Sequence, residues 1–242
     1  MSQVVLITGV SSGIGRASAL EFAKRGAQLV LGSRNEDAVK SLLAEFGPKN
    51  AVFLRTDVSK EADAKALVAL ALERFGRLDA AVNNAAQEAR GTVEAFDEAT
   101  YTRVFDTNVK GMFFAMQAQI PAMRRNGGGS IVNISSTGGS RGMAGMAIYV
   151  ASKHAVEGLS RSAALELAVD RIRVNVIAPG PTGTPMLDRV TDGHPEKFAQ
   201  RVPLGRVGTT EELARAIAWV SSEEASFVNG AVIPVNGGIS AG

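Results

Sequence analysis

Cysteine is absent from this chain of 242 residues, and histidine occurs only twice. Without a thiol the protein can form no disulfide, no thiolate metal site and no cysteine nucleophile. The two histidines, His154 and His194, are too few to build a zinc site of the histidine and cysteine type, so we expect no metal site. Any acid–base chemistry must therefore come from other residue types.

A strong net charge and a long hydrophobic run are also missing. The chain has 26 Lys and Arg against 24 Asp and Glu, and its densest basic spot is the pair Arg124 and Arg125. We therefore expect no nucleic-acid partner. No apolar run reaches about 18 residues, and the first residues enter an apolar stretch without a basic leader. We expect no membrane partner, no secretory signal and a cytoplasmic location.

The remaining composition, 45% hydrophobic and 21% charged, is typical of a globular protein with a sizeable core. No linker rich in proline, glycine or serine divides the chain, so residues 1–242 are expected to form one domain. The least regular stretch is 179–195, which is rich in proline and glycine. Because it is too long for an ordinary turn, we expect a substrate loop or lid at about 183–205.

Short apolar runs rich in β-branched residues alternate with longer segments of helical period. The expected strands are Val4–Thr8, Gln28–Gly32, Ala51–Arg55, Leu78–Asn83, Ser130–Ser135, Ile172–Ile177 and Ala231–Val235. Ser59–Phe75 has helical spacing, and Thr209 with Glu212 fits a capping box that opens another helix. This alternation predicts an α/β fold with a doubly wound, mostly parallel sheet of seven strands and helices on both faces.

A glycine-rich loop follows the first expected strand. Residues 8–15 read T-G-V-S-S-G-I-G and run directly into a helical segment. Glycine is needed where backbone turns sharply or approaches a phosphate, and the start of a helix offers free N–H groups to an anion. An ordinary glycine-rich turn is the alternative interpretation. The order of strand, loop and helix favours a dinucleotide site.

These residues resemble the loop of the short-chain dehydrogenase/reductase family, T-G-x-x-x-G-x-G, and the resemblance covers almost the entire chain. Asp57-Val58 matches the family's adenine-contacting pair, and residues 83–86 match its N-N-A-G motif with Ala86 in place of glycine. Read without the resemblance, Asn83 and Asn84 are turn formers. The resemblance implies a Rossmann-type fold that binds a nicotinamide dinucleotide. It assigns cofactor binding to Gly9, Ser11, Ser12, Gly13, Ile14, Gly15, Ser33, Arg34, Asn35, Asp57, Val58, Asn84, Ala85, Ala86, Tyr149, Lys153, Pro179, Gly180, Thr182 and Thr184.

The end of the second expected strand bears on which dinucleotide is bound. An NAD site of this fold usually has an acidic residue there, whereas this chain has Ser33, Arg34 and Asn35. An arginine can pair with the 2′-phosphate of NADP, so we expect NADP(H) to be preferred over NAD(H). In the other interpretation Ser33 caps the next helix, Glu36 completes its box and Arg34 is solvated. NADP-preferring relatives often carry a basic residue where this chain has Ser12, which weakens the expectation.

The most specific signal is Tyr149 with Lys153. On a helix, positions four apart share a face, so both polar tips can reach one cleft. An ammonium group near the phenol, helped by the positive charge of an oxidised nicotinamide, favours the phenolate and lowers a pKa that is ordinarily about 10. The tyrosine can then exchange a proton as a hydride moves. Taken alone, this spacing has an alternative interpretation, in which the two side chains are a solvent-exposed pair on a surface helix.

Ser136 strengthens the catalytic interpretation because it follows an apolar strand and ligands of open α/β sheets bind at the carboxyl ends of strands. With Tyr149 and Lys153 at the family's spacing, it resembles the hydroxyl that binds the substrate oxygen. The choice of Ser136 over Ser135 depends on that spacing. Asn108 matches the fourth member of the family's tetrad, which helps to hold a water next to the lysine; its alternative role is to stabilise a bend.

Two further positions follow from the resemblance. Residues 179–184 resemble the loop beside the nicotinamide, where the backbone near Thr182 and the hydroxyl of Thr184 would hold the carboxamide. Arg171 stands where relatives often have glycine. If the helix ends there with positive φ, the arginine side chain costs about 1 kcal/mol.

The motifs together predict an NADP(H)-dependent oxidoreductase acting on a small carbonyl or secondary alcohol, with Asn108, Ser136, Tyr149 and Lys153 as catalytic residues. The alternatives are a 3-oxoacyl-carrier-protein reductase, an NAD-dependent alcohol dehydrogenase or a non-catalytic NADP-binding regulator. The first would use Arg124, Arg125, Arg171 and Arg173 as basic residues for an acidic carrier. The resemblance also implies a homo-oligomer, commonly a tetramer, that includes the helix after Thr209 and the last strand.

Overall fold

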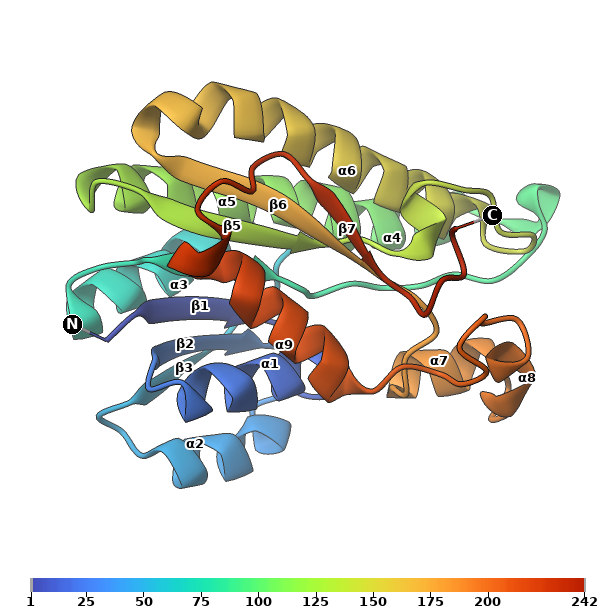
Figure 1. Cartoon of the computed structure of the whole chain (residues 1–242), viewed down its shortest axis with the longest axis horizontal. Helices are drawn as coiled ribbons and strands as arrows, with labels where there is room; N and C mark the ends of the chain where they lie inside the picture. Colours follow the sequence, from blue (N-terminus) through green and yellow to red (C-terminus); the bar gives the residue numbers. More distant parts are fainter. Residues whose placement is uncertain (1, 242) are drawn as a thin grey trace.

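The computed structural model describes residues 2–241, whose strands form one parallel sheet (Figure 1). Its seven strands are β1 (Val4–Thr8), β2 (Gln28–Ser33), β3 (Ala51–Arg55), β4 (Ala80–Asn83), β5 (Gly129–Ile134), β6 (Ile172–Pro179) and β7 (Val232–Val235). All residues of β1 and β4 are buried. This explains the nearly continuous apolar runs, because a strand with helices on both faces has no solvent side.

Helices alternate with these strands. They are α1 (Gly13–Lys24), α2 (Lys40–Phe46), α3 (Glu61–Phe75), α4 (Glu98–Phe105), α5 (Gly111–Arg125), α6 (Ala147–Leu167), α7 (Pro185–Val190), α8 (Glu196–Ala199) and α9 (Thr210–Ser221). A π-helical turn, Asp106–Lys110, joins α4 to α5. No helix within residues 2–241 is long and apolar enough to cross a membrane.

The sheet is covered on both faces, as Figure 1 shows. Helices α1, α2 and α9 pack on one face around a core that includes Phe22, Leu29 and Ile217. Helices α3, α5 and α6 pack on the other around Leu67, Met123 and Ile131, and α4 packs against α6. The predicted fold class is confirmed, and the sheet is parallel at every pairing.

The strand order determines where a ligand can bind. The order is β3-β2-β1-β4-β5-β6-β7, so the chain moves outward from β1 in one direction and then returns to place β4 on its other side. The loops that leave β1 and β4 therefore diverge at the carboxyl ends of these strands and open a crevice. The glycine loop follows β1, and Asn84 follows β4.

The sequence predicted most elements with boundary errors of one or two residues. The capping box of Thr209 and Glu212 is present, and Arg171 has a φ of 56°, as predicted. The expected lid region contains two short helices, α7 and α8, that the sequence pattern did not predict. Each has at most six residues, so neither could show a helical period.

Candidate active site

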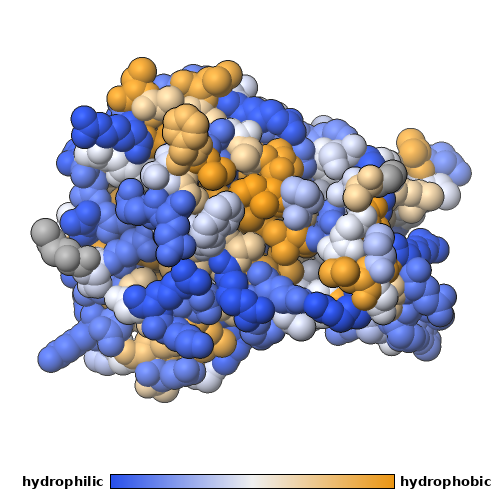
Figure 2. All heavy atoms as spheres, in the orientation of Figure 1, coloured by the Kyte–Doolittle hydropathy of each residue, from blue (hydrophilic) through white to orange (hydrophobic). Residues whose placement is uncertain are grey.

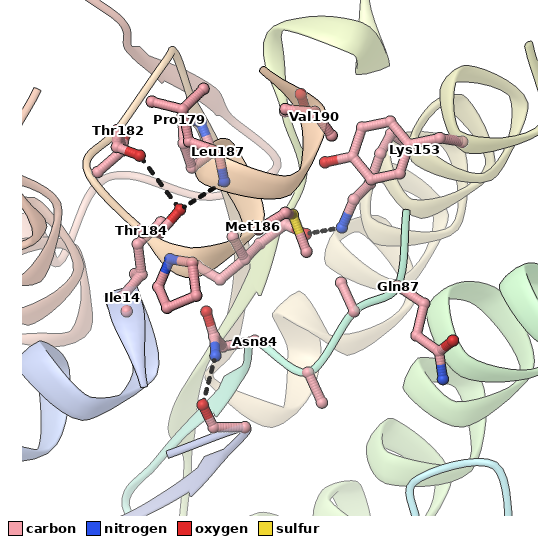
Figure 3. Close-up of a pocket in the computed structure, with 18 of the residues that line it drawn as sticks. Ile14, Asn84, Gln87, Lys153, Pro179, Thr182, Thr184, Met186, Leu187 and Val190 are labelled. Carbon is pink, nitrogen blue, oxygen red and sulfur yellow. Dashed lines mark hydrogen bonds between the residues drawn. The ribbon is translucent and has the colours of Figure 1, made fainter. Parts of the chain in front are cut away.

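A pocket of about 970 Å³ opens at the carboxyl ends of the strands. Figure 3 looks into it: Ile14 comes from α1, Asn84 and Gln87 from the segment after β4, Lys153 from α6, and Thr184 and Met186 from the region of α7. A cavity of this size is large enough for a cofactor together with a small substrate.

Most of the predicted site residues line this pocket. They are Gly9, Ser11, Ser12, Gly13, Ile14, Ser33, Arg34, Asn35, Asp57, Val58, Asn84, Ala85, Ala86, Ser136, Tyr149, Lys153, Pro179, Gly180, Thr182 and Thr184. Gly15 and Asn108 do not line it. Gly15 lies behind the loop, where a Cβ atom would be 2.3 Å from the carbonyl oxygen of Gly9, so its role is to let the loop close.

The glycine loop presents backbone donors to the pocket. Helix α1 starts at Gly13, its N-cap Ser12 forms no side-chain capping bond, and its first turn has no acidic residue. The first N–H groups of α1 are therefore not occupied by a capping side chain, and no carboxylate repels an anion there. This donor set fits the diphosphate of a dinucleotide.

Asn84 anchors the loop from the opposite strand. Its Nδ2 donates to the carbonyl oxygens of Thr8 and Gly9, at 3.0 and 3.2 Å, and the Thr8 hydroxyl accepts from the N–H of Asn84. The interpretation of Asn84 as only a turn former is therefore wrong: its side chain joins the ends of β1 and β4, which are the two walls of the crevice.

The other end of the pocket has the polar residues expected around an adenosine. Ser33 accepts a hydrogen bond from the N–H of Asn35 at 3.2 Å, and no capping box with Glu36 forms. Arg34 is exposed and has no ion pair among residues 2–241. Burial opposes ionisation of Asp57, but hydrogen bonds from Ser59 and the nearby Arg34 charge outweigh it and hold the Asp57 pKa below its ordinary value.

Tyr149 and Lys153 lie one turn apart on α6 and are both buried, with exposed fractions of 7% and 3%. The Nζ of Lys153 is 5.6 Å from the centre of the Tyr149 ring and donates to the Ile134 carbonyl at 2.8 Å (Figure 3). The two side chains therefore share one side of the helix and reach the pocket together, as the spacing predicts.

Burial shifts the pKa values of Tyr149 and Lys153 in opposite directions. Burial raises the pKa of Tyr149 to about 12, although the Ser136 hydroxyl moderates the rise, and burial lowers the pKa of Lys153 to about 8. In the chain without a dinucleotide, loss of solvent therefore dominates both pKa shifts. Tyr149 is protonated at neutral pH and can act as a proton donor.

The two serines after β5 have different surroundings. Ser135 is buried, and its hydroxyl donates to Glu157 at 3.0 Å, which occupies it inside the fold. Ser136 is only partly buried, and its hydroxyl accepts from the N–H of Gly138 and interacts with Tyr149. Of the two, Ser136 has the hydroxyl that a ligand next to Tyr149 can reach.

Asn108 lies in the π-helical turn and is buried. Its side chain accepts from the N–H of Gln87 at 2.8 Å and donates to the Gln87 carbonyl and the Ser152 hydroxyl. It borders a small second cavity together with Lys153. Asn108 therefore holds the segment after β4 against α6, at a position beside the cavity that Lys153 also borders.

The predicted nicotinamide loop leads into the lid. Thr184 caps α7 by accepting from the N–H of Leu187 at 3.2 Å, and its hydroxyl donates to the Thr182 carbonyl (Figure 3). At Gly180 a Cβ atom would be 2.7 Å from Asn236, so the last strand passes close behind the loop. The threonines thus have structural partners in addition to facing the pocket.

Sequence reasoning expected a lid on the substrate side but did not single out the individual residues that line the pocket there. Arg141, Arg189, Arg201 and Ile239 line the pocket. Arg141 follows Ser136 by five positions, which the sequence could have indicated. Arg201 follows α8 within the lid expected at 183–205, whereas Ile239 comes from the end of the chain and no local pattern connects it to the site.

Comparisons with known proteins agree with this geometry. A family profile described as enoyl-(acyl carrier protein) reductase matches residues 9–240. Levodione reductase of Leifsonia aquatica is 39% identical over 252 residues, which span 99% of this chain and 94% of that protein. The crystal structure of a 3-ketoacyl-(acyl-carrier-protein) reductase from Brucella melitensis complexed with NADH has a TM-score of 0.93 at 35% identity and covers 98% of each chain. A short-chain type dehydrogenase/reductase from Mycobacterium marinum has a TM-score of 0.94 at 32% identity, over 99% of this chain and 96% of that one.

Proposed function

This chain belongs to the short-chain dehydrogenase/reductase family, and from that membership we propose that it transfers a hydride between NADP(H) and a small carbonyl compound or secondary alcohol. The observation that carries the proposal is the shared pocket of Ser136, Tyr149 and Lys153 with the glycine loop. An acid–base group and a dinucleotide site at one crevice are the two parts that such a reaction requires.

The chain's own residues supply the proton chemistry. The hydroxyls of Ser136 and Tyr149 bind the carbonyl oxygen, and Tyr149 gives its proton to that oxygen as negative charge develops there. The ammonium of Lys153, 5.6 Å from the ring, stabilises the phenolate that remains. The bound dinucleotide supplies or accepts the hydride. In the reverse direction Tyr149 removes the alcohol proton.

Arg34 supports NADP(H) over NAD(H). It lines the pocket beside Ser33, is exposed and is free of ion pairs within the described chain, so its guanidinium is available to a 2′-phosphate. Such a charged hydrogen bond contributes about 1.5–3 kcal/mol.

Calorimetric titration of the protein and of Arg34→Met with both oxidised dinucleotides tests the proposed preference for NADP(H). We expect the variant to lose about ten- to a hundred-fold affinity for NADP and little for NAD. Equal wild-type affinities for the two dinucleotides would overturn the proposed preference, and tighter binding of NAD would favour an NAD enzyme.

The basic residues considered for an acidic carrier protein are largely engaged elsewhere. Arg124 pairs with Asp170 at 2.7 Å, and Arg173 donates to three backbone carbonyls, those of Val220, Ser222 and Val228. None of the basic residues in that group lines the pocket. We therefore favour a small carbonyl compound over a carrier-bound thioester as the substrate.

A panel of carbonyl compounds with NADPH tests the reaction class. The panel should include ketones, keto acids, an acetoacetyl thioester and aldehydes, and loss of reduced-nicotinamide absorbance reports turnover. Turnover of at least one small carbonyl compound is expected. If no compound is turned over while NADPH binds, a non-catalytic dinucleotide-binding protein becomes the better description.

We also propose that the protein is a cytoplasmic homotetramer in which β7 and α9 form contacts. β7 is an edge strand, and Phe227, Trp219 and Leu165 are exposed apolar side chains on or near the elements beside it. Figure 2 shows apolar surface over the part of the molecule where Figure 1 places β7. Exposed apolar patches favour association.

Light scattering of the wild type should give the mass of four chains. Phe227→Asp should lower the measured mass, and a monomeric wild type would contradict the proposal.

A further inference from the structure

The substrate side of the pocket is unusually rich in arginine. Arg90, Arg141, Arg189 and Arg201 line it, whereas the only acidic residue lining the pocket within residues 2–241 is Asp57, at the dinucleotide side. Met143, Met146 and Met186 supply apolar surface between them. A pocket for a purely neutral substrate would need no such accumulation of positive charge.

Two of these arginines are neutralised just outside the pocket. Arg189 pairs with Glu88 at 2.6 Å, and Arg90 pairs with Asp192 at 3.0 Å. Both ion pairs connect the segment after β4 to the region of α7. Their charges are therefore already used to hold the lid, and they leave little net positive charge for a ligand.

Arg141 differs because its guanidinium has no carboxylate partner among residues 2–241. Its Nη1 donates to the Ile239 carbonyl at 2.6 Å, but its Nε is buried and has no hydrogen-bond partner within residues 2–241. Nη2 likewise has no acceptor in that range. Because Arg141 lines the pocket, the unoccupied Nη2 can donate to a ligand carboxylate.

Arg201 supplies a second unpaired charge. Its guanidinium stacks at 5.3 Å over the Phe198 ring, and it has no ion pair among the described residues. The next residues contact the C-terminal turn: the N–H of Leu204 donates to the Gly237 carbonyl at 3.2 Å. Arg141 is bonded to the same turn at Ile239. The turn thus connects the segment of Arg201 to Arg141 at one end of the pocket.

We propose that the substrate carries a carboxylate, bound by Arg141 with Arg201 contributing charge, while its carbonyl carbon lies at Ser136 and Tyr149. The ligand class is a keto acid, or the corresponding hydroxy acid, whose carboxylate is separated from the reacting carbon by an apolar spacer that packs against the methionines. This inference rests on the proposed function, since it extends the same pocket from its reaction to its substrate.

Matched pairs of substrates test the proposal. We suggest 4-oxocyclohexanecarboxylate and 4-oxopentanoate, each against its methyl ester, with NADPH. In the wild type kcat/KM for each acid should exceed that of its ester by about ten- to a hundred-fold, mainly through KM, which is the range expected of a charged hydrogen-bonded pair. In Arg141→Met the ratio of acid to ester should fall close to one.

Two further variants separate recognition from folding. Arg141→Lys keeps the charge but loses the planar guanidinium, so its ratio should lie between those of the wild type and Arg141→Met. Arg90→Met removes a pocket arginine that already has a carboxylate partner, and its ratio should match that of the wild type. An equal loss of the ratio in Arg90→Met would mean that general charge, and not Arg141, selects the substrate.

Binding distinguishes failure of this proposal from failure of the proposed reaction. Calorimetric titration of the same acids and esters into the protein with oxidised dinucleotide needs no turnover. Tighter binding of acids that depends on Arg141 supports the site even if no substrate is reduced, in which case the reaction proposal fails alone. Equal binding of acids and esters, no binding of either at millimolar concentration, or tighter binding of inorganic phosphate than of the acids would overturn the carboxylate site.

Discussion

The two sides of the pocket are built by different means. On the dinucleotide side, Asn84 joins β1 to β4 through hydrogen bonds to backbone, and the loop closes tightly enough that Gly15 has no room for a Cβ atom. On the substrate side, exposed arginines and carboxylates hold α7 in place, as in the pair of Arg189 with Glu88. The dinucleotide side is held by buried backbone contacts, and the substrate side is held by ion pairs between side chains that reach solvent.

This difference has an energetic consequence. A tight backbone approach tolerates almost no change, because an added atom must displace the loop or the strand beside it. Exposed ion pairs contribute about 0–1 kcal/mol each and can break and re-form. The dinucleotide side can therefore be specific for a shared cofactor, while the substrate side can differ among relatives and open for exchange of substrate and product.

Tyr149→Phe should have the largest effect, because Tyr149 lies where the two sides meet. Removing the hydroxyl removes the proton donor, so kcat should fall by at least about a thousand-fold. Dinucleotide affinity should stay within a few-fold, since that side is built from other residues. Steady-state kinetics with NADPH and calorimetry measure the two quantities. Tyr101→Phe, at an exposed tyrosine outside the pocket, is the matched control and should retain full activity.

Lys153→Met should be more stable than the wild type at pH 7, although it should be inactive. Lys153 has a pKa of about 8 when folded and 10.5 ordinarily, so below pH 8 the folded protein bears a buried charge. Each pKa unit by which burial lowers the Lys153 pKa costs about 1.4 kcal/mol of folding free energy at pH 7. Subtracting about 1 kcal/mol for the lost hydrogen bond to the Ile134 carbonyl leaves a net stabilisation of about 2 kcal/mol in the variant.

The pH dependence checks the sign of that prediction. Between pH 8 and 10.5 the unfolded chain holds a proton on Lys153 that the folded chain has released, so wild-type stability rises with pH in this window. The advantage of Lys153→Met should therefore shrink from pH 7 to pH 9.5. Denaturant unfolding at both pH values measures it, and a gap that widens would contradict the assigned burial cost.

Alanine substitutions at two glycines, one on each side of the pocket, test the contrast between the two sides directly. Gly15→Ala would place a Cβ atom 2.3 Å from the Gly9 oxygen, whereas at Gly142, on the substrate side, a Cβ atom meets nothing within 4 Å. We expect Gly15→Ala to weaken dinucleotide binding by about ten-fold or more, and Gly142→Ala to change it by less than about two-fold. Calorimetric titration decides; similar losses in the two variants would remove the contrast between a rigid and a tolerant side.

The smallest effect is expected at the lid. A double-mutant cycle of Glu88→Gln and Arg189→Met should give a coupling free energy of about 0.5 kcal/mol in stability, because both groups reach solvent. Added salt should speed product release slightly in the wild type and not in the double variant. A coupling above about 2 kcal/mol would mean that the substrate side is held as firmly as the dinucleotide side.

The same division explains what the sequence could predict. The strands, the glycine loop and the Tyr149–Lys153 pair are local patterns, and each was predicted at its position. The bond from Arg141 to Ile239 joins residues 98 positions apart, so no spacing rule connects them. The raised pKa of Tyr149 in the chain without a dinucleotide was not predicted, because it depends on burial by distant elements that a helix pattern does not reveal.

The central claim is that the pocket makes Tyr149 a proton donor whose acidity rises when the dinucleotide binds. The chain has two tyrosines, so in Tyr101→Phe the tyrosinate absorbance reports Tyr149 alone. We expect no phenolate below about pH 10 in the free protein, where burial holds the pKa at about 12, and its appearance at distinctly lower pH once oxidised NADP is added. Identical titration curves with and without the dinucleotide would contradict the claim.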